Sequence, residues 1–125
     1  MNVIKLRKNV IEIPFQDENG KEILKLQFDK SDEHVNQFQK DFNSFTKRFG
    51  GLENTTVDED MEPEEVKEIV KEFTDSMLGE GSFDAMYKLN PSTMIVTQYV
   101  YQIAIGIKEE LEEEDLKAVE DKYLK

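Results

Sequence analysis

An Asn19-Gly20 dipeptide between two runs of alternating apolar residues constrains this fold more than any other feature. Asn-Gly favours a two-residue hairpin turn, because both residues tolerate a positive φ. Such a turn brings the apolar residues of both runs onto one face, as cross-strand packing requires. The expected pairs are Phe15 with Leu24, Ile13 with Leu26, and Ile11 with Phe28. The sequence therefore predicts a β-hairpin over residues 9–28.

The segment before the hairpin offers a candidate for a third strand. Val3, Ile4 and Leu6 are β-favouring or apolar residues that are close enough together to form a short strand. Pro14 lacks a backbone N–H, so we expect its strand to be an edge strand at that point.

After the hairpin, apolar residues recur at three- and four-residue spacing, which is typical of amphipathic helices. We expect helices over about residues 32–49, 63–78, 82–89 and 91–122, and an exposed acidic loop over 50–62. The expected N-caps are Ser31 or Asp32, then Ser82, then Asn90 followed by Pro91. Gly50-Gly51 and Gly79 are expected to end two of the helices. The predicted fold is a single α+β domain over residues 1–125, mostly helical.

The apolar stripes of the first and last helices lead to two different predictions. The first helix has phenylalanines at 38, 42, 45 and 49, and we expect this stripe to pack in the core rather than line a ligand pocket. The last helix is apolar on two sides. Its wide face is centred on Tyr99 and Ile103, and its narrow face combines Met94, Tyr101 and Ile105, with Gln98 between them. A helix of this kind is either central in its domain or shared with a partner. Under the second alternative, Met94, Gln98, Tyr101 and Ile105 are candidate partner-binding residues.

Charge and composition exclude several classes of function. The 125 residues include 28 acidic and 16 basic ones, which gives a net charge of −12 with no basic cluster. Nucleic acid and anionic membranes are therefore poor partners. There is no cysteine, so disulfides and thiolate metal sites are excluded. No signal sequence or membrane-length apolar run is visible, so we expect a protein of the cytoplasm.

A search for chemical motifs leads to no catalytic, metal or cofactor site. His34 is the single histidine, and we expect it to be a solvated residue of a first helical turn. Asp58, Asp60 and Glu62 alternate as in a calcium loop, but Pro63 stands where that loop needs glycine. Gly79-Glu80-Gly81 lacks the lysine of a phosphate-binding loop, so a helix-ending turn is the expected structure. We therefore do not expect an enzyme.

The stretch Leu78-Gly79-Glu80-Gly81-Ser82-Phe83-Asp84-Ala85-Met86-Tyr87, followed by Asn90-Pro91-Ser92, resembles the tail assembly chaperones of long-tailed phages and prophages of Gram-positive bacteria. The layout of hairpin, helices, acidic loop and acidic last helix is also similar. The resemblance implies a non-enzymatic protein of the host bacterial cytoplasm. Such a protein forms homo-oligomers and binds tape measure and tail tube proteins during virion assembly. The alternative hypothesis, from the charge alone, is an acidic inhibitor or decoy that binds a basic protein.

Overall fold

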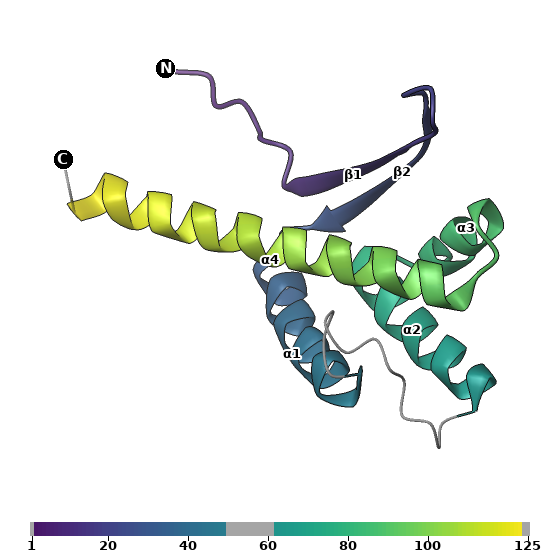
Figure 1. Ribbon diagram of the computed structural model, residues 1–125. Coiled ribbons are helices and arrows are strands. Elements are labelled where there is room, and N and C mark those ends of the chain that lie inside the picture. Colours follow the sequence, from purple (N-terminus) through teal and green to yellow (C-terminus); the bar gives the residue numbers. More distant parts are fainter. Residues whose placement is uncertain (1, 50–61, 124–125) are drawn as a thin grey trace.

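The computed structural model describes residues 2–49 and 62–123 of the chain. Its elements are β1 (Val10–Gln16), β2 (Glu22–Asp29), α1 (Asp32–Phe49), α2 (Pro63–Leu78), α3 (Ser82–Leu89) and α4 (Thr93–Tyr123). The predicted α+β class, a hairpin followed by four helices, is confirmed. Gly50-Gly51 and nearly all of the expected acidic loop lie outside the described residues. Figure 1 shows α4 crossing the molecule between the hairpin and the pair α1 and α2.

The hairpin has the predicted register. β1 and β2 are antiparallel, and the three expected apolar pairs are all present: Ile11 with Phe28, Ile13 with Leu26, and Phe15 with Leu24. This register places six apolar side chains on the face that meets the helices, and Ile11 and Phe28 are buried there.

The turn of the hairpin differs from the predicted one. The Gly20 amide donates to the Asp17 carbonyl (3.0 Å) and the Asp17 amide donates to the Lys21 carbonyl (2.9 Å), so three residues form the loop. Of the turn residues only Gly20 has a positive φ (81°), and Asn19 does not. The extra loop residue is offset by a bulge, since Ile23 has no cross-strand partner. These two irregularities cancel, which is why the predicted register still holds.

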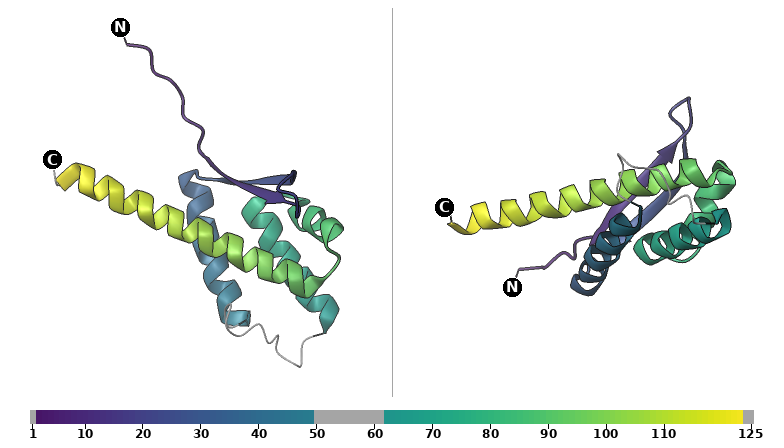
Figure 2. Two further views of the ribbon diagram at one scale, coloured as in Figure 1. Left: turned by 45° about the horizontal axis from the view of Figure 1, so that its top comes forward. Right: turned by 60° about the horizontal axis from the view of Figure 1, so that its bottom comes forward.

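The candidate third strand was wrong. The described part of the chain contains one sheet of two strands, and residues 2–9 belong to neither. Val3, Ile4 and Leu6 are 86%, 86% and 96% exposed. Figure 2 shows this segment leading away from the rest of the molecule.

The helix starts follow the expected chemistry in part. The Ser31 hydroxyl caps α1 by accepting a bond from the His34 amide (3.4 Å), as one of the two alternatives predicted. The cap of α4 is Ser92, whose hydroxyl accepts from the Ile95 amide (3.3 Å), so the helix begins at Thr93 rather than at residue 91. Asn90 instead closes α3, with its amide donating to the carbonyl of Met86 (3.0 Å).

The corner between α2 and α3 is the expected helix-ending turn. Gly79 and Gly81 have φ values of 105° and 90°, a region that favours glycine. Ser82 does not cap α3 with its side chain, contrary to expectation. The Asp75 carboxylate of α2 does so instead, accepting from the Phe83 amide at 3.0 Å. One side chain thus ties two consecutive helices together.

The core contains the phenylalanine stripe of α1, as predicted. Phe38, Phe42, Phe45 and Phe49 are all buried. Phe45 stacks on Phe73 of α2 with ring centroids 4.4 Å apart. The buried apolar cluster takes residues from both strands and all four helices.

Candidate partner-binding surface

The surface of α4 depends on how the helix is rotated in the domain. Its deepest residues are Val96, Val100 and Ala104, each fully buried. The buried face is therefore centred on Val100. The sequence predicted a centre between Tyr99 and Ile103, which is about 80° around the helix. The predicted rotation of α4 was wrong by this amount.

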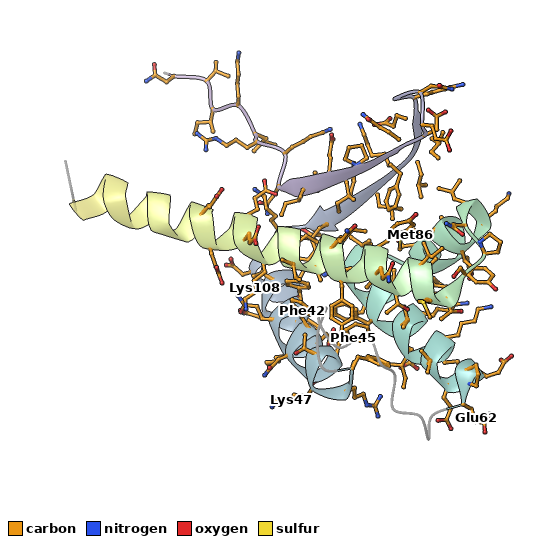
Figure 3. All side chains as sticks on the ribbon, in the orientation of Figure 1. Phe42, Phe45, Lys47, Glu62, Met86 and Lys108 are labelled. Atoms are coloured by element: carbon orange, nitrogen blue, oxygen red, sulfur yellow. The ribbon has the colours of Figure 1, made fainter. Side chains whose placement is uncertain are left out.

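The rotation follows from the contacts that α4 makes with the hairpin and with α1. On one side Tyr99 meets Phe15 of the hairpin edge to face, with ring centroids 6.2 Å apart. On the other side Tyr101 packs against Phe42 and Phe45 of α1, at 6.4 and 5.0 Å. Figure 3 labels Phe42 and Phe45 on the part of α1 that lies beneath α4. Both apolar sides of α4 thus contact other elements of the domain, at Tyr99 and at Tyr101, as the central alternative predicts. Met94, on the narrow side, stays exposed.

Only two of the four candidate partner-binding residues lie together on the surface. Met94 is 69% exposed, and Gln98 is exposed one turn further along α4. Tyr101 is 1% exposed and belongs to the core, so its expected place on this surface was wrong. Ile105 is half-buried and lines a separate hollow of about 580 Å³ between α1 and α4.

The structure adds two apolar residues that the sequence did not single out. Leu89 ends α3 and is 45% exposed, and Ile23 of the hairpin bulge is 46% exposed. Both line one hollow between the hairpin and the corner of α3 and α4. The position of Leu89 directly before Asn90-Pro91 could have predicted its exposure, because the last residue of a helix has no following turn to cover its side chain. The bulge at Ile23 had no such signal.

The later part of α4 is acidic and extends beyond the other elements (Figures 1 and 2). Glu109, Glu110, Glu112 and Glu113 are exposed on it. Exposed carboxylates at this density attract a basic partner in a salt-dependent way.

A second charged cluster holds the start of the hairpin. Lys8 Nζ lies 2.9 Å from Glu12 Oε1, and Lys25 Nζ lies 3.4 Å from Oε2 of the same carboxylate. The hydrogen bond from Lys8, together with the charges of both lysines, lowers the pKa of Glu12 below its ordinary value. All three groups are solvent-exposed, so they orient the strand more than they stabilise it.

His34 has a structural role rather than the expected solvated one. Its Nε2 lies 2.9 Å from the carbonyl oxygen of Met77, so the ring donates from this nitrogen. The ring also lies against Phe28, with centroids 4.8 Å apart. Residue 34 therefore ties α1 to α2 and to the sheet.

The described residues hold no group of three or more His, Asp or Glu side chains placed to bind a metal ion. The expected acidic alternation at Asp58 and Asp60 lies outside them. No helix within residues 2–49 and 62–123 has the length and apolar character needed to cross a membrane. Comparison of the chain with protein-family models, curated proteins and solved structures found no match.

Proposed function

We propose that this chain is a non-enzymatic tail assembly chaperone of long-tailed phages or prophages of Gram-positive bacteria. In the bacterial cytoplasm it self-associates and binds tape measure and tail tube proteins while the tail is built. The partner-facing surface in this proposal is Leu89, Met94 and Gln98, which we call the corner surface.

The observation that carries the proposal is the place of the family-like stretch in the fold. Residues 78–92 form one continuous corner: the end of α2, the turn with two positive-φ glycines, α3, and the cap of α4. Leu89 at the end of α3 and Met94 in the first turn of α4, just after this corner, are two of the large apolar side chains that the described residues leave exposed. The stretch that resembles the family thus lies beside exposed apolar side chains that a partner could cover.

The mechanism is temporary cover of an apolar helical surface on a long partner. Each apolar contact is worth about 25 cal/mol per Å² removed from water, before the costs of association. A surface as small as one corner binds weakly by itself. Many copies that contact one another along the partner bind strongly through their combined contacts, and tube subunits can displace them one by one.

The test is co-expression with the tape measure protein encoded in the same phage genome. We expect the chain to raise the yield of tape measure protein in the cleared lysate and to co-purify with it. Met94→Glu should reduce both, because it places a charge in the apolar contact. Asn36→Glu introduces the same side chain at an exposed site on α1 and should change neither. Absence of co-purification for the unaltered chain contradicts the proposal.

The alternative, an acidic inhibitor or decoy, is favoured by the exposed glutamates of α4. It predicts a basic partner whose binding disappears between low and physiological salt. Binding through the corner surface instead depends weakly on salt. Repeating the co-purification at both salt concentrations therefore separates the two functions.

A further inference from the structure

A furrow runs along β1 and α4 and reaches the bulge of β2 at Ile23. Two hollows, of about 770 Å³ and about 340 Å³, line up there. The two hollows adjoin, and we call the pair the furrow. They share four lining residues: Ile13, Pro14, Gln102 and Ile103.

Apolar and polar residues both line the furrow, and carboxylates lie at its ends. Phe15, Tyr99 and Ile103 line it and are only half-buried, so apolar surface remains open to solvent. Asp17 and Glu18 lie at one end and Glu110 lies at the other. No lysine or arginine lines either hollow among the described residues. The chemistry suits an extended peptide that is both apolar and basic.

Residues 2–7 of the chain have this chemistry. Val3, Ile4 and Leu6 are the three most exposed large apolar side chains of the described residues, at 86%, 86% and 96%. Lys5 and Arg7 alternate with them and make no ion pair within the described part of the chain. In a protein of net charge −12, this segment is a local excess of positive charge next to exposed apolar surface.

The lengths also agree. The furrow follows α4 from Tyr99 to Glu110, and eleven helical steps of about 1.5 Å span about 17 Å. Residues 2–7 in extended conformation make five steps of about 3.3 Å, which is also about 17 Å.

The segment cannot easily fill the furrow of its own chain. The Lys30 amide donates to the Asn9 carbonyl (2.9 Å), and Lys8 pairs with Glu12 (2.9 Å), so residues 8 and 9 continue the line of β1. Folding back would need a tight turn at these residues, which would break both contacts. The segment would then reach only the near end of the furrow.

We propose that residues 2–7 of one copy bind in the furrow of a second copy. In the extended segment Ile4 and Leu6 lie on one side and cover Phe15, Tyr99 and Ile103. Arg7, at the end of the segment, approaches the carboxylates at one end of the furrow. The inference deepens the self-association within the proposed function and rests on that function for its biological role. Its test needs no phage protein, so the two can fail separately.

The experiment uses two full-length variants and sedimentation equilibrium. Leu6→Glu alters the segment at a side chain that is 96% exposed, and Gln102→Arg brings a cation to the exposed rim of the furrow. We expect the unaltered chain to associate and each variant to dissociate at least tenfold more readily. Gln39→Arg, the same change at an exposed site on α1 and outside both hollows, is the matched control and should associate like the unaltered chain.

Mixing the two variants gives the decisive result. The Gln102→Arg copy keeps a normal segment and the Leu6→Glu copy keeps a normal furrow, so the mixture should regain association that neither variant has alone. Circular dichroism checks that both variants are folded. A strictly monomeric unaltered chain or a mixture that stays monomeric overturns the proposal. A loss of association in Gln39→Arg but not in Gln102→Arg overturns it as well. Absence of tape measure binding, by contrast, would count against the proposed function only.

Discussion

Truncation of Tyr101 tests whether α4 is the central helix of the domain. The Tyr101 ring is 1% exposed and lies against Phe42 and Phe45. An aromatic side chain buries about 150–250 Å², worth about 4–6 kcal/mol at about 25 cal/mol per Å². Alanine keeps part of that area, and mutations of buried aromatic residues to alanine cost about 3–5 kcal/mol. We expect Tyr101→Ala to lower the free energy of unfolding by this amount, out of a total of about 5–15 kcal/mol.

Equilibrium urea unfolding, followed by circular dichroism, measures the effect. With a slope near 2 kcal/mol per molar urea, a loss of about 4 kcal/mol moves the midpoint by about 2 M. Met94→Ala is the control on the same helix, and since Met94 is 69% exposed it should change stability by less than about 0.5 kcal/mol. A cost below about 1 kcal/mol for Tyr101→Ala, combined with lost association, would refute the burial argument and restore Tyr101 to a partner surface.

Three further predictions concern local structure. Gly20→Ala should lower the free energy of unfolding by about 1 kcal/mol because Gly20 has a positive φ, although the space around the added carbon is open. Asn19→Ala should lower it by less than about 0.5 kcal/mol. Thermal unfolding of both variants compares the two effects. Asp75→Ala should cost about 1–2 kcal/mol by urea unfolding, because an amide in the first turn of α3 loses its acceptor, and Asp75→Asn should cost less. NMR titration should find the pKa of Glu12 below the ordinary glutamate range and closer to it in Lys8→Ala; the small stabilisation from this pair is present above the unfolded-state pKa and is lost as pH falls through the folded-state pKa.

The hairpin was predictable because strand patterns have a period of two. The register that pairs Phe15 with Leu24 also places the other apolar pairs on the same face. Burial of that face in the core favours this register over its neighbours. The turn was less predictable. A three-residue loop with a bulge at Ile23 gives the same register beyond the bulge as the expected two-residue turn. In the sequence, Ile23 looks like any other apolar strand residue.

The helix bounds were predictable to within two residues, although the side chains that cap α3 and α4 were not the expected ones. The rotation of α4 was not predictable. Apolar side chains cover more than half of its circumference, so hydrophobicity alone does not say which part lies deepest. The answer depends on where Phe42 and Phe45 of α1 stand, which is tertiary information. The same limit applies to His34, whose acceptor on Met77 is 43 residues away.

Of the candidate surface, Met94 and Gln98 were found by their spacing, and Tyr101 was misplaced for the reason just given. The furrow could not be found from the sequence, because its walls come from β1 and from α4, which are far apart along the chain. The exposed segment was visible in the sequence, but as a candidate strand. Whether this segment pairs with a strand or binds in a groove depends on the fold and cannot be read from the sequence.

The central claim, that this chain acts by binding tape measure protein as an oligomer, is tested most directly by a mass measurement. Size-exclusion chromatography with light scattering gives the mass of the complex between the chain and the tape measure protein of the same phage. The proposed function predicts one species that contains several copies of the 14.6 kDa chain per tape measure protein. Separate elution of a monomeric chain and an uncovered tape measure protein would contradict it.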